Sequence, residues 1–556
     1  MDTVSIRDWC PVLLLLTFAV FFPVHNALSA RGDLVSYEVK QRSSDPEDIV
    51  FTKEEIDSLV LSEFGVTDLG STHDAAAVKI YYETVNAFNE LTTATALVTI
   101  PLAKTNAPTL CYNHGTTPTD LDVPSQSAIG GEAGYLLTLL SFSGGGYIGI
   151  AADYVGLGEN AGFHPYHHAP SQAAAVIDAI RAGQALARQL EGQTGTTLSN
   201  TDLFLTGFSQ GGHVTMCAHQ EIEENPTLGL SVRASAPAAG AYDLAASQLE
   251  AMVESPAVTS PFYVAYAIYA YHQIYSIPQN LEDFFVSSVA ANIPDLFDGT
   301  KTAQEVIDGL PSYTDMSQLL VYPSIQEIRQ NFPDLIAKLE ENSFHRWTPE
   351  NPMLMLYVDQ DVDVPPSNTF VTYSYMAPRG VPVRKQRVGS GFNHNDVGVE
   401  WIRAAREYFD SFLTPSQTTY DAWKSNLGSF SQNEIGAGED VIGSSADPNR
   451  DGVNNLVCYA LGLEPTLPAQ DGLPRIRTGE DGKIEMRVTR RTNDPSVSVV
   501  LETTTNLKPD SWTGSESVLS AGTPTMMGGG FEQVVYTSQL SASELGKHFF
   551  RLRIQR

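Results

Sequence analysis

The stretch Leu203-Phe-Leu-Thr-Gly-Phe-Ser-Gln-Gly-Gly-His213 carries the strongest structural signal in this chain of 556 residues. It opens with an apolar run typical of a buried strand and continues into the pentapeptide Gly207-x-Ser209-x-Gly211. Glycines on both sides allow a strand-to-helix turn in which larger side chains would collide, and the serine hydroxyl then stands exposed at the tip. The stretch therefore predicts a strand, a sharp turn and a helix, with Ser209 as a candidate nucleophile.

A nucleophilic serine in such a turn needs an acid, which is expected in a loop after a later strand. Residues 352–358 are apolar and are predicted to form a buried strand, and three aspartates follow it, Asp359, Asp361 and Asp363. We favour Asp361, because it stands three residues before the pair Val364-Pro365, and keep Asp363 and then Asp359 as alternatives.

The general base is expected after the acid, in the loop behind one further strand. Residues 383–388 are predicted to be that last strand, and a helix is predicted from about 399 to 412. His394 lies in the loop between them. It would remove the proton of Ser209 as the serine attacks an ester carbonyl, while Asp361 orients the imidazole and stabilises its charge.

The negative charge that develops on the carbonyl oxygen needs fixed N–H donors. One is the backbone N–H of Gln210, the residue after the nucleophile, and the second is expected from the loop after the third strand. Residues 108–113 are predicted to be that strand, and they lead into His114-Gly115-Thr116. We therefore predict Gln210 and Thr116 as the oxyanion hole.

The chain resembles secreted α/β-hydrolases of the secretory-lipase (lipase A) type over about residues 75–412. The similarity implies a carboxylic ester hydrolase with a helical cap, although Val358 replaces the glycine that commonly opens the acid loop. The segments that carry it are Ala76-Ala-Val-Lys-Ile-Tyr-Tyr-Glu-Thr84, Ala94-Thr-Ala-Leu-Val-Thr-Ile-Pro101, Tyr112-Asn-His-Gly-Thr116, Ala152-Asp-Tyr-Val-Gly-Leu-Gly158, His164-Pro-Tyr-His-His168 and Gly207-Phe-Ser-Gln-Gly-Gly212.

Alternating strand and helix signals predict the α/β class, with a mostly parallel sheet, helices on both faces and catalytic loops at the carboxyl ends of the strands. The expected catalytic domain covers residues 31–413. Its strands are predicted near 79–86, 94–101, 108–113, 146–153, 203–208, 230–236, 352–358 and 383–388, and its helices near 131–141, 170–191, 211–224 and 398–412.

An insertion at about 241–350 exceeds what the sheet and its helices need, and we predict a helical cap. Its first part, residues 261–275, is rich in tyrosine and apolar residues, and residues 325–339 form an amphipathic segment. Since ester pockets are mostly apolar, Phe262, Tyr266 and Tyr269 are candidate substrate-binding residues. The alternative is that this helix only packs on the core.

Three histidines, His164, His167 and His168, could as neutral imidazoles bind zinc. Two of them are adjacent, no cysteine or carboxylate motif accompanies them, and acyl transfer by a serine has no use for a metal. We therefore expect a structural loop beside the pocket and no catalytic metal.

The first 30 residues are predicted to be a signal peptide, because a 14-residue apolar run, residues 11–24, precedes a cleavage site near Ala30. No later stretch reaches 18 unbroken apolar residues, so we expect a secreted, extracellular or periplasmic protein without a transmembrane anchor. Removal of Cys10 would leave Cys111, Cys217 and Cys458, an odd number that favours buried thiols over a disulfide framework.

The net charge of −32, from 65 acidic and 33 basic residues, disfavours nucleic acid and anionic membranes as partners. It is typical of a well-solvated surface. A small-molecule or lipid ester is the expected substrate.

Residues 414–466 are rich in Ser, Thr, Gly and Gln at first and are predicted to be a linker. The loop 447–458 within it resembles the opening of an EF-hand, with Asp447, Asn449, Asp451 and Asn455 as candidate ligands of a structural calcium ion. The twelfth position, normally glutamate, is Cys458, so the alternative is a purely structural turn.

Residues 467–556 contain alternating segments that predict a small all-β, sandwich-like domain. The calcium-like loop and this tail together resemble C-terminal extensions of secreted bacterial proteins. Contact with a surface or a glycan, or a part in secretion, is the expected role of the domain.

The sequence thus predicts a secreted serine esterase or lipase that needs no cofactor apart from the candidate calcium ion. Two alternatives use the same residues on other bonds, a carbohydrate esterase that removes acetyl or feruloyl groups and a serine peptidase. A non-enzymatic adhesion or glycan-binding protein would leave the serine, aspartate, histidine order unexplained.

Overall fold

The structure, a computed structural model, divides into two compact units. The first comprises Met1–Phe344 and Asp361–Asn368, and the second His345–Gln360 and Thr369–Arg556. Apart from Ala30, the predicted signal peptide lies outside the described residues, and no helix among the described residues is long and apolar enough to cross a membrane. The structure describes residues 30–40, 49–65, 70–127, 134–160, 162–413, 419–424, 438–466, 469, 472–479 and 481–556.

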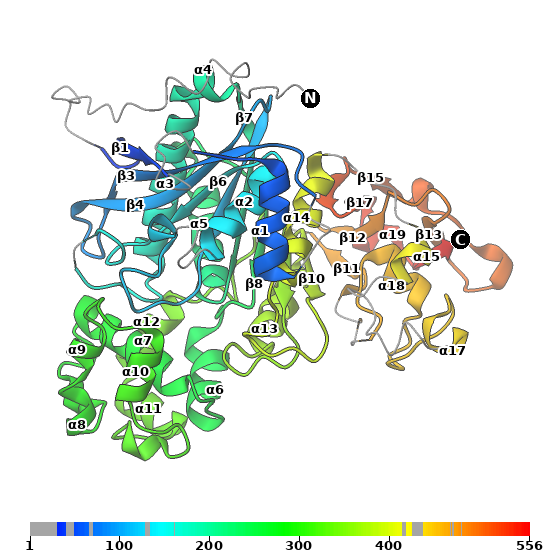
Figure 1. Cartoon of the computed structure of the whole chain (residues 1–556). Helices are drawn as coiled ribbons and strands as arrows, with labels where there is room; N and C mark the ends of the chain where they lie inside the picture. The colour runs from blue at the N-terminus through cyan, green and yellow to red at the C-terminus, as the bar shows by residue number, and fades with distance from the viewer. Residues whose placement is uncertain are drawn as a thin grey trace, which may run out of the picture. The chain divides into compact units, whose positions relative to one another are not determined.

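The first unit is built on a twisted sheet with the strand order β1-β3-β4-β6-β5-β7-β8, with β2 paired to β3 (Figure 1). Strands β6, β5, β7 and β8 are parallel, and β1, β2, β3 and β4 form its antiparallel edge, with β4 also antiparallel to β6. The strands are β1 (Leu34–Val39), β2 (Val50–Phe51), β3 (Ala75–Val85), β4 (Leu91–Pro101), β5 (Ala107–Asn113), β6 (Ile148–Ala152), β7 (Leu198–Phe208) and β8 (Val232–Ala238).

Helices cover both faces of this sheet. Thr99 of β4 hydrogen-bonds through Oγ1 to Ser143 of α2, and a Cβ on Gly183 of α3 would touch its neighbour Val98. Because consecutive residues of a strand point to opposite faces, α2 and α3 lie on opposite sides. The helices are α1 (Lys53–Phe64), α2 (Gly134–Gly144), α3 (Ala169–Gln189), α4 (Glu191–Thr194) and α5 (Gln210–Glu224).

The predicted mostly parallel sheet between two helical layers is confirmed. The prediction missed β1, β2 and α1, which precede the first predicted strand. Helix α1 carries a sequence signal that was not used, the capping box of Thr52 and Glu55, in which each residue bonds the other's backbone N–H. The predicted thiols Cys111, Cys217 and Cys458 are free and buried.

The insertion after β8 folds as a helical cap with its own core, which includes Phe262, Val264, Ile268 and Phe284. Its helices gather beyond one end of the strands of the first unit (Figure 1, green). They are η4 (Leu244–Gln248), α6 (Leu249–Glu254), α7 (Ser260–Tyr275), η5 (Leu281–Asp283), α8 (Ser287–Ala290), α9 (Ile293–Leu296), α10 (Ala303–Gly309), η6 (Met316–Gln318), α11 (Ile325–Asn331) and α12 (Pro333–Glu341).

The amphipathic segment 325–339 is not one helix but two, α11 and α12. Pro333 divides them because proline has no backbone N–H to donate within a helix and is tolerated only in the first turn. It occupies that place in α12.

The second unit contains a parallel pair of strands, β9 and β10, and two antiparallel sheets in the orders β11-β12-β17-β15 and β14-β13-β18. Met486 and Val488 of one sheet and Leu501 of the other share a core, as predicted for a sandwich-like domain. The elements are β9 (Met353–Tyr357), α13 (Ser367–Met376), η7 (Ala377–Arg379), β10 (Val383–Arg387), α14 (Glu400–Leu413), α15 (Tyr420–Lys424), α17 (Glu439–Ile442), α18 (Asn455–Leu461), β11 (Ile476–Thr478), β12 (Lys483–Arg491), β13 (Ser498–Thr504), β14 (Thr513–Gly514), β15 (Leu519–Ala521), β16 (Thr525–Gly528), β17 (Phe531–Ser541), α19 (Ala542–Leu545) and β18 (Phe549–Gln555).

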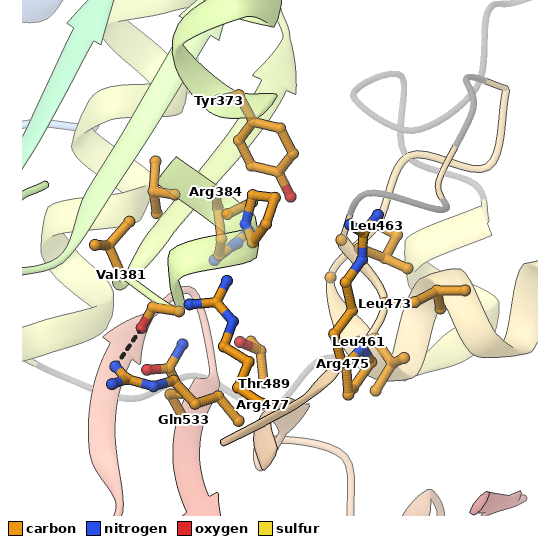
Figure 2. Close-up of a pocket in the computed structure, with 18 of the residues that line it drawn as sticks. Tyr373, Val381, Arg384, Leu461, Leu463, Leu473, Arg475, Arg477, Thr489 and Gln533 are labelled. Atoms are coloured by element: carbon orange, nitrogen blue, oxygen red, sulfur yellow. Dashed lines mark hydrogen bonds between the residues drawn. The ribbon is translucent and has the colours of Figure 1, made fainter. Parts of the chain in front are cut away.

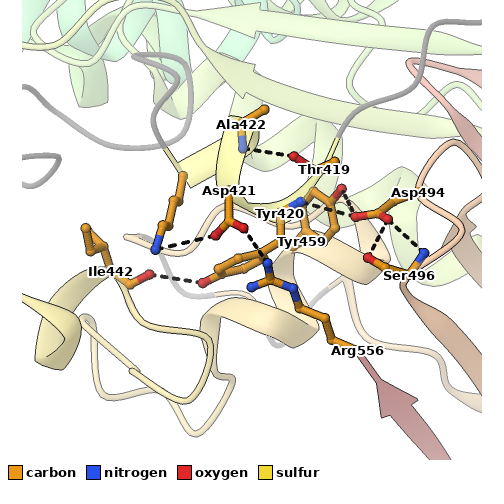
Figure 3. A network of polar contacts seen from close by, with 10 residues as sticks. Thr419, Tyr420, Asp421, Ala422, Ile442, Tyr459, Asp494, Ser496 and Arg556 are labelled. Carbon is orange, nitrogen blue, oxygen red and sulfur yellow. Dashed lines mark hydrogen bonds and ion pairs between the residues drawn. The ribbon is translucent and has the colours of Figure 1, made fainter.

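The buried carboxylate of Asp494 joins the segment before this sandwich to its strands (Figure 3). It accepts hydrogen bonds from the backbone N–H of Tyr420 at 3.1 Å and the hydroxyl of Tyr459 at 2.8 Å. Ser496 donates its backbone N–H and its hydroxyl to the same carboxylate. The described parts of residues 414–466 are therefore packed on the β domain.

Replacing Asp494 with alanine removes the acceptor for these donors, and we expect a loss of about 2–4 kcal/mol in the free energy of unfolding of this unit. Chemical denaturation measures it. Asp510→Ala, on the exposed surface of the same domain, is the matched control and should change little. Equal stability of the two variants would contradict the role of Asp494.

The Asp494 contacts also predict a pH dependence. Burial alone would raise the pKa of Asp494, but hydrogen bonds from Ser496 and Tyr459 hold it below its ordinary value. The stability that Asp494 supplies is thus present above the unfolded pKa of about 3.9 and is lost as the pH falls through the lower folded pKa. Melting curves of the wild type and Asp494→Asn should accordingly converge at low pH.

Candidate active site

Ser209 sits at the tip of the turn between β7 and α5 with φ 61° and ψ −122°. A positive φ is unusual for a residue with a side chain, so the surrounding backbone must hold this conformation in place. The backbone N–H of Ser209 donates to the carbonyl of Ala238 at 3.0 Å, which ties the turn to the end of β8. The residue is 7 % exposed.

The turn needs glycine at three positions because neighbouring backbone leaves no space for a Cβ there. A Cβ on Gly207 would lie 2.4 Å from the carbonyl oxygen of Gly211, and one on Gly211 would lie 1.9 Å from that of Asn113. Gly212 packs equally closely on β8, where a Cβ would lie 2.4 Å from the carbonyl of Ala238. Any side chain at these positions would force the strand and the helix apart.

The turn after β5 lies beside the serine. Asn113 is opposite Gly207 in the parallel pairing of β5 with β7, so the two strands end side by side. A Cβ on Gly115 would be 3.8 Å from the Cβ of Ser209. The structure therefore brings the two predicted oxyanion segments, Gln210 at the start of α5 and the turn that ends at Thr116, next to the serine.

Tyr154 supports the turn after β5. Its hydroxyl donates to the carbonyl of His114 at 3.0 Å, and its ring stacks on the His114 imidazole with centroids 4.0 Å apart. The preceding Asp153 accepts hydrogen bonds from the hydroxyl of Thr95 and the backbone N–H of Ser125. Tyr154, in the family-like segment 153–158, thus supports the turn after β5, a role that sequence reasoning did not assign.

His164 positions the side chain of Gln210. Burial lowers the pKa of His164 to about 3, so its ring is neutral. Its Nδ1 lies 2.9 Å from the carbonyl of Val155, an acceptor, so Nδ1 carries the proton and Nε2 accepts from the Gln210 amide nitrogen at 2.7 Å.

The other two histidines of the predicted cluster have different neighbours. The ring of His167 lies edge-on to that of His213, with centroids 4.6 Å apart. Nδ1 of His168 hydrogen-bonds with the hydroxyl of Ser171 at 2.9 Å. These contacts fit the structural loop that the sequence analysis expected.

Tyr266, one of the predicted substrate-binding residues, joins the cap to the turn after β5. Its hydroxyl donates to the carbonyl of Thr117 at 3.1 Å, and its ring stacks on Tyr166 with centroids 4.5 Å apart. The Tyr166 hydroxyl shares a hydrogen bond of 2.9 Å with that of Thr116. Tyr166, to which sequence reasoning assigned no role, therefore links Thr116 to the cap.

Phe262 and Tyr269, the other two candidates on α7, both pack against Phe297. Their ring centroids lie 6.0 and 6.1 Å from that of Phe297. Phe262 is buried in the cap core, whereas Tyr269 is only partly buried. Both residues thus have packing roles within the cap.

The three candidate acids differ in the hydrogen bonds that their carboxylates accept. The carboxylate of Asp361 is buried and accepts the backbone N–H groups of Asp363 at 3.0 Å and Val364 at 2.8 Å. Asp363 accepts instead from the hydroxyl of Thr259 at the start of the cap.

Asp359, in the second unit, accepts the N–H of Gly391 at 3.0 Å and lies 3.6 Å from a guanidinium nitrogen of Arg387. Asp363 and Asp359 are thus each bound to a neighbouring loop or strand.

His394 lies in the second unit, 3 % exposed, in the loop after β10. That loop runs beside the one that leaves β9, since the backbone N–H of Gln360 donates to the carbonyl of Phe392 at 3.1 Å. Gln360 directly precedes Asp361, and Phe392 stands two residues before His394. The chain segments that lead into the predicted acid and base are therefore hydrogen-bonded neighbours.

The candidate calcium loop is closed by its own hydrogen bonds. Asp447 accepts the backbone N–H groups of Asp451 and Gly452, and Asn449 also accepts from Asp451. Asp451 accepts from Val453 and from Ala469, 18 residues further on. Asn455 donates its side-chain amide to the carbonyls of Val441 and Gly443.

Cys458 occupies the place of the bidentate glutamate in this loop. It is 1 % exposed, and burial raises the pKa of its thiol to about 12, so it remains protonated. A protonated sulfur is a poor ligand for calcium, which binds oxygen. The donor set is thus incomplete for a calcium ion.

No protein-family model and no curated protein sequence matches the chain. Solved structures do match. The rice cell wall degrading esterase LipA from Xanthomonas oryzae is 26 % identical with a TM-score of 0.58, over 68 % of this chain and 96 % of that one. The fold is that of the α/β-hydrolases.

Two further structures agree on this fold. A protein from Legionella pneumophila, provisionally named as a hydrolase, is 24 % identical with a TM-score of 0.62, over 69 % of this chain and 100 % of that one. Candida antarctica lipase A is 14 % identical with a TM-score of 0.51, over 75 % and 90 %. These two neighbours support the fold, and the similarity to LipA at 26 % identity supports a hydrolase function for the chain.

Replacing Gly211 with alanine tests the close approach at the turn. The new Cβ would collide with the carbonyl of Asn113, and we expect a loss of about 3 kcal/mol or more in the free energy of unfolding. Gly192→Ala is the matched control, because a Cβ there has no atom within 4 Å. A Gly211→Ala variant as stable as this control would show that the predicted contact is absent.

Removing calcium tests the loop 447–458. Because Cys458 stands where calcium loops carry glutamate, we expect the melting temperature to be the same with EGTA and with calcium-saturated EGTA. A fall of several degrees in EGTA that added calcium reverses would instead identify the loop as a calcium site.

Proposed function

We propose that this chain is a secreted serine hydrolase of carboxylic esters, an esterase or lipase, that acts through an acyl-enzyme. The observation that carries the proposal is the strained turn at Ser209 beside the turn after β5. A serine hydroxyl at the tip of such a turn, next to two sets of backbone N–H groups, is the arrangement that acyl transfer needs. The similarity to an esterase at 26 % identity supports the ester bond as the target.

In the proposed reaction, Ser209 Oγ attacks the ester carbonyl while His394 accepts its proton. The backbone N–H groups of Gln210 and Thr116 stabilise the negative charge on the carbonyl oxygen. His394 then donates the proton to the departing alcohol, which leaves the acyl group on Ser209. A water molecule, deprotonated by His394, releases the acid and restores the serine.

Asp361 is the proposed acid that orients His394. Its carboxylate is fixed by two backbone N–H groups, whereas Asp363 holds the cap residue Thr259 and Asp359 holds Gly391. The hydrogen bond between Gln360 and Phe392 supports the pairing, since it joins the segments that lead into the two residues.

The proposed reaction uses no cofactor. Export with removal of residues 1–30 is part of the proposal, and it rests on the apolar run before Ala30. The proposed substrate is a small-molecule or lipid ester, and Phe262, Tyr266 and Tyr269 support the cap by packing on Phe297.

A carbohydrate esterase is a second candidate that uses the same residues. The neighbour from Xanthomonas oryzae is described as degrading plant cell walls, and cell-wall polysaccharides carry ester-linked acyl groups. Release of acetate from acetylated polysaccharide would distinguish it from an esterase that accepts only small or lipid esters.

Removing the nucleophile tests the proposal. We expect Ser209→Ala to lower kcat on nitrophenyl esters by at least about 10³-fold without changing the melting temperature, because the hydroxyl forms the acyl-enzyme. Initial rates over a series of acyl lengths measure this. Hydrolysis that survives the substitution would exclude Ser209 as the nucleophile.

Three single substitutions distinguish the candidate acids. Asp361→Asn should lower kcat by about 10⁴-fold, because the amide no longer stabilises the charged imidazole. Asp359→Asn and Asp363→Asn are the matched controls, and their kcat should fall far less. If only Asp363→Asn lost its turnover, the assignment of Asp361 would be wrong.

A further inference from the structure

The second unit contains a cleft that the proposed reaction does not use. It lies between the segment 373–384, the segments 461–463 and 472–475, and the sheet of β11, β12 and β17, and it contains about 690 Å³ of space free of protein atoms, open solvent included. Figure 2 shows Leu461, Leu463 and Leu473 on one side and Tyr373 and Val381 across from them.

One face of the C-terminal sheet forms the floor of this cleft. On β12, Glu485, Arg487 and Thr489 line the cleft, while the alternate residues Met486 and Val488 belong to the buried core on the other side. Side chains of a strand alternate between the two faces, so the pattern of β12 sets polar groups toward the cleft and apolar groups toward the core.

The neighbouring strands extend the same polar face. Arg477 of β11 is paired with Glu485, and Gln533 of β17 is paired with Thr489. Both belong to the lining.

The lining has an excess of positive charge. Among the described residues, four arginines line the cleft, Arg384, Arg475, Arg477 and Arg487, against a single acidic residue, Glu485. In a chain with a net charge of −32 and only 33 basic residues, this concentration is exceptional. An anion repelled by the rest of the surface would find an attractive potential here.

Two of these arginines are held by neutral groups. Arg487 donates to the carbonyl of Gly380 at 2.9 Å, and Arg384 donates to that of Gly528 at 3.2 Å while it stacks on Phe531. Among the described residues, no carboxylate lies within 4.0 Å of a guanidinium nitrogen of Arg384, Arg477 or Arg487. Their charge is thus not neutralised by ion pairs.

Like charges crowd Arg477 in particular. Burial lowers its pKa, and the charges of Arg487, Arg379 and Arg475 lower it further, with Glu485 opposing them. An anion among these guanidinium groups would relieve their mutual repulsion.

We propose that this cleft binds an acidic saccharide, whose carboxylate or sulfate group is held by Arg477 and Arg487. A guanidinium presents two parallel N–H groups that match the oxygens of such an anion. Hydrogen-bonding groups of Thr489 and Gln533 beside the arginines suit sugar hydroxyls, and Leu463 suits the apolar face of a sugar ring. The site is independent of Ser209 and of the proposed ester hydrolysis.

Isothermal titration of the full chain with galacturonate, galactose and sodium sulfate tests the proposal. Galacturonate should bind, and galactose, which has the same ring without the carboxylate, should not. Sulfate should bind more weakly than galacturonate because it lacks the ring and hydroxyls. Binding of galactose as tight as that of galacturonate would overturn the anionic site, and equally tight sulfate would overturn the saccharide in favour of a simple oxyanion.

Variants locate the site. Arg477→Gln should weaken galacturonate binding by about tenfold or more, since one charged hydrogen-bonding partner is lost. Arg477→Lys keeps the charge but not the paired N–H groups, so its affinity for galacturonate should lie between those of the wild type and Arg477→Gln. Lys508→Gln removes the same charge from an exposed position of the same domain and is the matched control.

Melting temperatures show that each variant is folded before titration. If Arg477→Gln bound galacturonate as tightly as the wild type, or if Lys508→Gln lost as much affinity as Arg477→Gln, the galacturonate site would lie outside this cleft and the proposal would be overturned.

Discussion

The close approach of backbone where the turn at Ser209 meets the end of β5 controls the rest of the candidate site. Gly207 and Gly211 leave no room for a Cβ against the carbonyl of Asn113. The register of β5 with β7 therefore fixes both the unusual φ of Ser209 and the place of the turn at His114. Strain at the serine is tolerated because three strands and a helix determine its position.

The cap is anchored to the same turn. Tyr266 bonds the carbonyl of Thr117, Tyr166 bonds Thr116, and the N–H of Asp120 donates to Gly299 in the cap at 2.9 Å. The segment 116–120, which includes the proposed donor Thr116, and the cap are thus joined by hydrogen bonds. A substitution in the cap helix α7 should for that reason shift the turn after β5 without altering the conformation of Ser209.

The sequence predicted the layers of the fold and the turn at Ser209, because strand runs, glycine spacing and helix starts are local signals. It gave Tyr166 only as part of the segment His164-Pro-Tyr-His-His168, because the role of Tyr166 comes from a stack on Tyr266, one hundred residues later in the chain. Tyr154 and His164 were noticed only as parts of a family-like segment, since their partners His114 and Gln210 are also distant. Pro333 is a local signal that could have predicted the break between α11 and α12. The arginine cleft depends on strand pairing, which patterns in a single sequence do not give.

The central claim is that Ser209 is the activated nucleophile of this chain. A fluorophosphonate probe reacts covalently with activated serines, and mass spectrometry of the digested protein locates the adduct. We expect one adduct, on Ser209, that is lost in His394→Ala while the variant stays folded. An adduct on another serine, or undiminished labelling in His394→Ala, would contradict it.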